Sequence, residues 1–483
     1  MIDKYFPQVN SSVSNRNNKK RRPRRSKFVR KNKVIASPNV RPLILKTGSR
    51  YITSISKYKI KQLTFSELVA RYVPHNLLYL ISTPESPFYL KRLRKDKSLK
   101  SIESTITIPG VFSLCDNMKE TIYTLKKIIY VFFVKIPRHI VFDYSNCTKI
   151  DIEAQALMDV ILMEYKNFLN TCSSLKTQRA VYELPESFGA KNIKDEKLKK
   201  MMFSVGSPAN LGIKQRDYQD IIKYSMCSHC ALTENDRKEL KARKELDTSM
   251  AIDYVIACLK KMGKRLTPKK RSDLCTVIGE ILINAEEHST LHHRFSMGYF
   301  HELREGGKHT GLFHIVILNF GASIYEKFSK NSECPPHTVE RMKALSERYT
   351  SRSLFKSREF EEESLWTLYA LQQGVTSVPD MQRGSGTIQF IRSFFNIKGS
   401  QSVDNISRMV LLSGKTEILF DGTYNVHEII DGSNKFNVMT FNESGSIEDC
   451  PDNRYVKTTD TYFPGTIIAA KILLNEDDVK EIN

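Results

Sequence analysis

A helix-forming stretch over residues 269–289 sets the strongest limit on how this chain can fold. At 100° per residue, its apolar side chains fall on one face, made by Leu274, Val277, Ile278, Ile281, Leu282 and Ala285. Glu280 and Asn284 are one turn apart, about 40° from each other on the flank of that face. We therefore expect a buried helix that points a carboxylate and an amide at whatever lies beside it.

Two interpretations of this polar pair are open. A carboxylate can orient or deprotonate a water molecule, and an amide oxygen can ligate Mg²⁺, which prefers oxygen donors. Alternatively, both side chains merely form hydrogen bonds at the edge of an amphipathic helix.

Three further motifs follow this helix along the chain. The segment LFHIVILNFGASI is typical of a strand that ends with Asn319, Gly321 and Ile324. The segment RGSGTIQFIRSFF places small residues before a helix, where backbone N–H groups can approach phosphate oxygens, and its residues are Arg383, Gly384, Ser385, Gly386 and Thr387. The segment FPGTIIAAKILL begins a strand with Gly465 and Thr466. Each motif also has a plain structural interpretation, as a strand end, a helix-leading turn and a strand start.

In this order, the four segments resemble the GHKL (Bergerat) ATPase superfamily, and E-x-x-x-N-A-x-x-H is most similar to the anti-sigma-factor kinases. The resemblance covers residues 248–475 and implies ATP and Mg²⁺ as cofactors. It implies that Glu280 is the general base and Asn284 the Mg²⁺ ligand, with His288 at the histidine position of that type. It further implies a lid over about 325–383.

The same resemblance assigns the remaining motif residues to nucleotide contacts. It implies that Asn319 and Thr466 contact adenine, with Gly321, Ile324 and Gly465 beside them, and that the 383–387 segment lies at the phosphates. This chain departs from the family pattern at two positions, because Asn319 replaces an aspartate and Ser323 replaces a glycine. An asparagine oxygen still accepts a hydrogen bond, though without a charge.

Residues 103–206 predict strands and helices in the order β-α-β-α-β, including a strand over HIVFDYS, a helix over 150–169 and a strand over 178–185 that ends at Pro185. This segment resembles a STAS domain through IPRHIVFDYSNCTKIDIEAQALM. In phosphorylated members a serine follows the aspartate at the helix start, whereas here Asp151 is followed by Ile152 and Glu153. Glu153 is either a mimic of the phosphorylated state or an acidic residue favoured in a first helical turn.

The charge of the chain is concentrated at one end. The net charge is +22, and residues 1–50 carry fifteen Lys and Arg with one acidic residue. We expect a disordered arm there, which suits either salt-dependent contacts with nucleic acid or a solubilising role. The candidate contacts are Lys19, Lys20, Arg21, Arg22, Arg24 and Arg25.

Other classes of protein are disfavoured. The longest apolar run, Ile128 to Val134, is far shorter than a membrane span, and the N-terminus lacks the apolar core of a signal peptide. Nine scattered cysteines fit reduced thiols, which predicts a cytoplasmic protein. The pairing of a STAS-like segment with an ATPase-like one resembles bacterial regulators, which implies a bacterial protein. Zinc binding by Cys227, His229 and Cys230 is disfavoured because no second pair of donors is near in sequence. His292 and His293 are expected to cap the helix or face solvent.

The predicted fold class is α/β (α+β). It comprises a basic arm (1–50), a segment of unknown role (51–102), the STAS-like domain (103–206), a helical connector (207–247) and the Bergerat-type α/β sandwich (248–475). The predicted function is an ATP-binding regulatory protein, with an unknown protein partner and a possible homodimer. The alternatives are a nucleic-acid-binding effector that uses ATP as a switch and a serine kinase acting on a separate partner.

Overall fold

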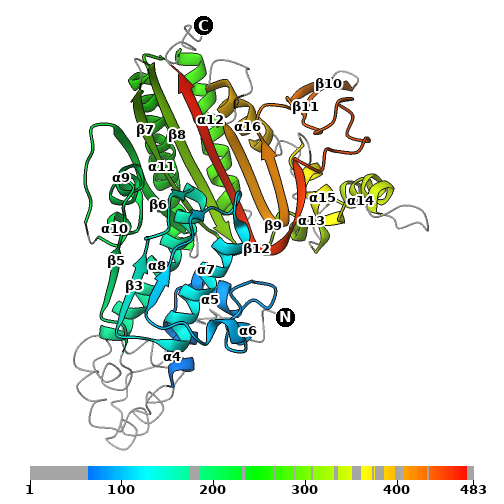
Figure 1. Cartoon of the computed structure of the whole chain (residues 1–483). Coiled ribbons are helices and arrows are strands. Elements are labelled where there is room, and N and C mark those ends of the chain that lie inside the picture. The colour runs from blue at the N-terminus through cyan, green and yellow to red at the C-terminus, as the bar shows by residue number, and fades with distance from the viewer. Residues whose placement is uncertain are drawn as a thin grey trace, which may run out of the picture. The chain divides into compact units, whose positions relative to one another are not determined.

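The computed structural model describes residues 64–475 (Figure 1), apart from 175–183, 213, 231–233, 266, 288, 306–307, 331–334, 351–359, 373–374, 376–385, 398–403, 405 and 432–433. The basic arm lies outside the described residues, with Lys19, Lys20, Arg21, Arg22, Arg24 and Arg25, so its binding to nucleic acid stays a prediction.

A small parallel sheet follows a run of short helices. These helices are α4 (Phe65–Tyr72), α5 (His75–Ser82), α6 (Leu90–Leu93) and the 3-10 turn η2 (Lys97–Leu99). The sheet has the order β1-β3-β5, with β1 (Thr105–Thr107), β3 (His139–Asp143) and β5 (Ser187–Lys191). A second parallel pair joins β2 (Val111–Phe112) and β4 (Lys149–Ile150). The strand predicted over HIVFDYS is confirmed. The strand predicted over 178–185 falls mostly outside the described residues, and the third strand of this sheet is β5, which follows Pro185.

Two long helices cross over between these strands. The first, α7 (Met118–Tyr130), continues into a π turn, η3 (Val131–Lys135). The second, α8 (Ile152–Ser174), confirms the predicted helix and has no glycine or proline. Almost every side chain in its first half is buried, around the whole circumference. A helix of this kind needs neighbours on all sides, and α8 packs against α4, α5, α10 (Ser207–Asn210) and two strands of a larger sheet.

The larger sheet has five strands in the order β6-β7-β8-β12-β9, and every neighbouring pair is antiparallel. Its strands are β6 (Ile221–Cys230), β7 (His293–Glu305), β8 (Lys308–Phe320), β12 (Val456–Asn475) and β9 (Arg408–Phe420). The segment predicted as a helical connector contributes the edge strand β6, which follows α9 (Glu196–Val205) and α10.

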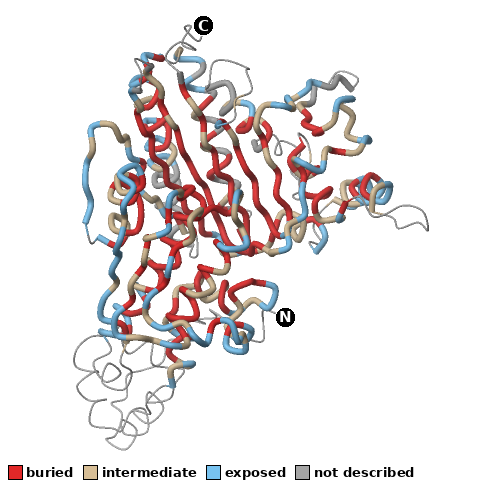
Figure 2. Tube along the Cα trace, viewed as in Figure 1, coloured by how far each residue is buried: buried red, intermediate tan, exposed pale blue. Residues whose placement is uncertain are grey.

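Both faces of this sheet are covered, and Figure 2 shows its strands buried along most of their length. On one face, Phe313 and Ile315 of β8 and Ile468 of β12 share a core with α11 (Glu234–Lys261), α12 (Pro268–Glu287) and α16 (Gly386–Ile397). On the other face, Ile467 and Ala469 of β12 line a small cavity with Leu114 and Glu153. Because side chains alternate along a strand, α8 and α12 lie on opposite sides of the sheet.

The insert between β8 and β9 is rich in helices, as predicted. It contains α13 (Ile324–Ser329), α14 (Pro336–Thr350) and α15 (Glu362–Ala370). Ser323 and Glu326 form a capping box that begins α13. A hairpin of β10 (His427–Asp431) and β11 (Asn434–Val438) lies between β9 and β12.

The described residues therefore form a mixed fold of helices with parallel and antiparallel sheets, which agrees with the predicted α+β class. The residues that the structure describes from Phe65 onward form one compact unit. Among the described residues, no helix has both the length and the apolar character to span a membrane.

Candidate functional site

The helix that carries the predicted catalytic pair is α12. It confirms the predicted amphipathic pattern, because Leu274, Ile278, Ile281 and Leu282 are all buried. Glu280 and Asn284 lie on this helix, one turn apart, but their side chains lie outside the described part, as does His288. The roles of these three residues stay predictions, whereas the backbone that carries the first two is in place.

Asn319, at the end of β8, links this helix to the neighbouring strand. Its Nδ2 donates to the Ala285 carbonyl oxygen of α12 at 2.5 Å. Its Oδ1 accepts a hydrogen bond from the Thr466 N–H of β12 at 3.2 Å. The side chain is buried, with 3 % of the residue exposed. The carbonyl on one side and the N–H on the other fix which way the amide points.

Thr466 and Ser413 extend this network across the sheet to the start of α13. The two hydroxyls are 2.9 Å apart, and Ser413 also donates to the Gly465 carbonyl oxygen at 3.1 Å. The Ile324 N–H donates to Ser413 Oγ at 2.9 Å. The two residues predicted to contact adenine, Asn319 and Thr466, thus lie in one hydrogen-bonded group with Ile324 and Gly465, which were predicted to lie beside them.

Two glycines let the backbones around Asn319 approach closely. Gly321 has φ +128°, and a Cβ there would lie 2.2 Å from Thr290 Oγ1. Gly465 has φ +147°, and a Cβ there would lie 2.1 Å from the Asn319 carbonyl oxygen. Both positions need glycine for conformation and for space.

The predicted phosphate segment leads into α16, which begins at Gly386 and packs against α12. Gly386 and Thr387 therefore open a helix, as predicted, although their side-chain surroundings are not described. Arg383, Gly384 and Ser385 lie outside the described part. The structure thus brings together the end of β8, the end of α12 and the pair Gly465–Thr466. This pair lies in the middle of β12 and does not begin the strand as predicted, because β12 already starts at Val456. Helix α16 lies beside α12.

A buried charged group that the sequence motifs did not indicate holds the C-terminal end of α12. Glu286 Oε2 lies within ion-pair distance of His229 Nδ1 and 3.7 Å from Arg294 Nε. Arg294 Nη2 is 2.8 Å from Asp247 Oδ2 of α11. Arg294 is 1 % exposed, so removing either partner would leave a buried charge. The members of this charged group are spread over residues 229–294, so no local sequence spacing could have identified the group.

A second charged group joins Arg408 of the large sheet to Asp116, Lys149 and Asp151 of the 103–206 segment. Arg408, the first residue of β9, donates from Nη1 and Nη2 to the Asp116 carboxylate at 2.7 and 2.9 Å. Arg408 Nη2 is also 3.2 Å from Asp151 Oδ2, and Lys149 contacts both carboxylates. Because Arg408 hydrogen-bonds to it, the pKa of Asp116 is held well below its ordinary value.

Glu153 is not an exposed charge on α8. It is 5 % exposed and accepts hydrogen bonds from Ser113 Oγ and the Leu114 N–H at 3.1 and 3.3 Å. Burial, followed by the nearby Asp151, raises the pKa of its carboxyl. Glu153 therefore occupies a packed core position. It is not an exposed charge that could mimic phosphoserine.

The histidines and cysteines expected to be incidental have different surroundings from one another. His229 faces Glu286, so the C-x-H-C residues do not form one donor set. His292 is exposed at a bend with φ +48°. The expectation that His293 caps the helix or faces solvent is wrong, because it begins β7 and is 8 % exposed. Long-range packing of α5 over the sheet edge buries it.

No known protein family, curated protein or solved structure matches this chain.

Proposed function

We propose that this chain is a Mg²⁺-dependent, GHKL-type ATP-binding regulatory protein whose nucleotide state is coupled to its STAS-like segment. One observation carries the proposal most of all. Asn319 joins α12, which bears Glu280 and Asn284, to the middle of β12, where Gly465 and Thr466 lie. The motifs that resemble the ATPase family thus come from distant parts of the chain and converge at one sheet end.

The direction of the Asn319 amide supports a preference for adenine. Its Nδ2 is committed to the Ala285 carbonyl oxygen, and its Oδ1, which accepts from Thr466 N–H, has a second lone pair. That oxygen suits the amino group of adenine, which donates, and not the carbonyl of guanine, which accepts. An aspartate would place a carboxylate oxygen against the Ala285 carbonyl, which explains physically why an asparagine fits here.

The packing of α8 supports regulation within the chain. This helix lies against β8 and β12, the two strands that carry Asn319 and Thr466. The Arg408–Asp116 contact fixes the loop between β2 and α7. A change at the nucleotide end of these strands would reach α8 through direct contact. In phosphorylated STAS domains a serine stands at the start of the helix that corresponds to α8, whereas here the buried Glu153 lies in that first turn. We therefore expect control through docking and not through phosphorylation at that position.

The base preference gives a test of the proposal. ATP and GTP would be compared for binding to the full chain by calorimetry with Mg²⁺ present, using wild type, Thr466→Val and the exposed control Thr107→Val. We expect ATP to bind at least about tenfold more tightly than GTP, which corresponds to about one mismatched hydrogen bond. Thr466→Val should weaken ATP binding and Thr107→Val should not. Equal affinity for both nucleotides would contradict the adenine assignment, and no binding would contradict the proposal itself.

The coupling is tested separately by hydrogen exchange. Addition of ATP and Mg²⁺ should change the exchange of the α8 amides as well as those of α12. If only α12 responds, the chain binds ATP without the proposed control of the STAS-like segment.

A further inference from the structure

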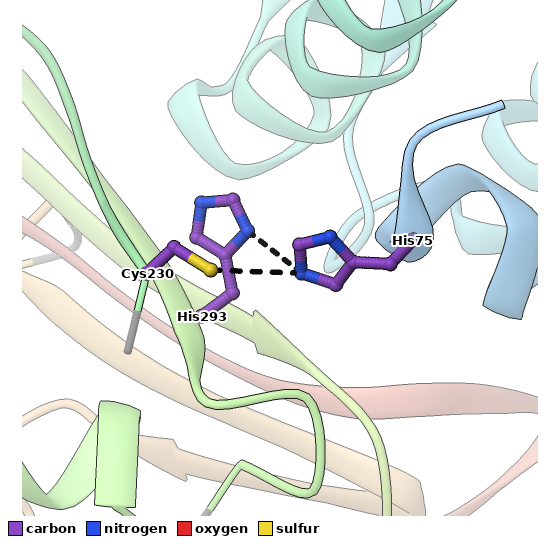
Figure 3. A group of neighbouring side chains, drawn as sticks. All are labelled: His75, Cys230 and His293. Carbon is purple, nitrogen blue, oxygen red and sulfur yellow. Dashed lines mark hydrogen bonds between the residues drawn. The ribbon is translucent and has the colours of Figure 1, made fainter. Parts of the chain in front are cut away.

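Three side chains from distant parts of the sequence form a cluster of metal-binding donors at the β6 edge of the large sheet (Figure 3). His75 begins α5, Cys230 ends β6 and His293 begins β7. His75 Nε2 lies 3.2 Å from His293 Nδ1 and 3.9 Å from Cys230 Sγ. All three donor atoms lie within 4.8 Å of one another.

From this geometry we propose that His75, Cys230 and His293 bind a Zn²⁺ ion. Tetrahedral zinc with Zn–N near 2.0–2.1 Å and Zn–S near 2.3 Å holds two nitrogens roughly 3.3 Å apart and a nitrogen and a sulfur roughly 3.6 Å apart. The two distances from His75 match this arrangement closely. Two imidazoles and a thiolate are donors that suit zinc and do not suit Mg²⁺ or Ca²⁺.

The surroundings of His293 orient its donor atom toward the other two residues. Ser228 Oγ lies 2.7 Å from His293 Nε2, so an Nε2–H donated to the serine leaves the Nδ1 lone pair facing His75. A hydrogen bond on the outer nitrogen is the usual support of a metal-bound histidine.

Asn76 contacts the same lone pair. Its Nδ2 lies 2.7 Å from His293 Nδ1 and donates to Glu164 Oε1 at 2.5 Å. Zinc would take over the Nδ1 lone pair, while the amide keeps its bond to Glu164. The Asn76 amide thereby ties the cluster to α8, because Glu164 lies on that helix.

Zinc in this position would join α5 to two strands of the large sheet. The three donors supply three of the four zinc positions, which leaves one for a water molecule or another ligand. Binding converts the Cys230 thiol to a thiolate and releases its proton to solvent, so affinity should rise with pH. This site is separate from Asn319 and does not depend on the proposed nucleotide function.

The test uses the untagged full chain after treatment with a chelator. Zn²⁺ affinity would be measured by competition with a chromogenic chelator, and Co²⁺ would serve as a spectroscopic probe of thiolate ligation. Wild type should bind one Zn²⁺, show a thiolate-to-cobalt charge-transfer band and melt at a higher temperature with zinc than without it. Cys230→Ser should abolish the band and weaken zinc binding at least about tenfold, as expected for a disturbed metal site.

Two matched controls separate this cluster from other thiols and histidines. Cys227→Ser changes a cysteine of the same strand, and His292→Ala changes the exposed neighbour of His293; both should retain the band and the affinity. If Cys230→Ser does not fold, His75→Ala should keep the cobalt–thiolate band but weaken zinc binding by a similar factor. The proposal is overturned if wild type binds no zinc, or if the band survives Cys230→Ser and disappears in Cys227→Ser.

Discussion

Asn319 and Ala285 are held together by a 2.5 Å hydrogen bond from the amide Nδ2 to the backbone carbonyl oxygen. This bond fastens the end of β8 to the last turn of α12 and requires a donor at position 319. The neutral amide at position 319 is thus explained by the backbone carbonyl that accepts its hydrogen bond.

Asn319→Asp should therefore destabilise the chain, although it restores the residue type of the family. The new carboxylate would face the Ala285 carbonyl and leave it without its donor, which costs about 1–3 kcal/mol. Urea unfolding at neutral pH measures the free energy difference. Asn453→Asp makes the same change at an exposed position and should be nearly neutral. An Asn319→Asp protein as stable as wild type would contradict the hydrogen-bond assignment.

Gly321→Ala should weaken the same junction. The added methyl group meets Thr290 at a φ of +128°, which combines a steric clash with backbone strain of about 1–3 kcal/mol. Gly189 has nothing within 4 Å of a built Cβ, so Gly189→Ala is the matched control. Thermal unfolding of both variants is the measurement, and an equal effect at both glycines would show that the approach to Thr290 is not tight.

Arg408→Ala should lower the stability of the chain, because it removes a contact between the 103–206 segment and the large sheet. Arg408 donates two hydrogen bonds to Asp116, at 2.7 and 2.9 Å. Losing them should lower the free energy of unfolding by roughly 1–2 kcal/mol at pH 7. Arg348 pairs with Glu448 at 3.1 Å with both side chains more than half exposed, so Arg348→Ala should cost little.

The pH dependence of the Arg408 effect follows from Asp116. Its folded pKa is lowered, so the stabilisation is present above the ordinary carboxyl pKa of about 4 and is lost as the pH falls below it. The stability gap between wild type and Arg408→Ala should narrow as the pH falls from about 5 to about 2. A gap that stays constant over that range would exclude the ion pair as its source.

Glu153→Gln should have the opposite pH dependence. Burial raises the folded pKa of Glu153, so wild type loses stability as the pH rises above the ordinary carboxyl value of about 4 and the buried group must ionise. Relative to wild type, Glu153→Gln should gain stability between about pH 5 and about pH 8. Glu85→Gln, at an exposed position, should show no such trend. A glutamine variant that loses stability with rising pH would mean that Glu153 acts as a needed charge.

Much of the fold follows from the periodicity of the sequence. The parts of the fold that do not follow from it share one cause. The pattern of α12 and the apolar strand β8 are readable because local spacing reports their buried faces. Strand β7 was not predicted, because the sheet is covered on both sides and Arg294, Ser296 and His301 are buried among its apolar residues. This removes the polar–apolar alternation on which strand prediction depends.

Local spacing in the sequence also fails to reveal which residues meet in the candidate nucleotide and zinc sites. The predicted contacts Asn319 and Thr466 are neighbours in the structure because β8 and β12 pair in that register, a pairing that motif order could suggest only by resemblance. The donors His75 and Cys230 are 155 positions apart. No spacing rule reaches that far, since only the packing of α5 beside β6 and β7 brings them together.

The Mg²⁺-dependent nucleotide site that we propose on α12 can be tested directly. The most direct measurement is calorimetric titration of ATP into the full chain, with and without Mg²⁺, for wild type and Asn284→Ala. The account predicts that wild type binds ATP and that Mg²⁺ strengthens this binding, an increase that Asn284→Ala loses while remaining folded. ATP binding by wild type that is absent, or equal with and without Mg²⁺, would contradict it.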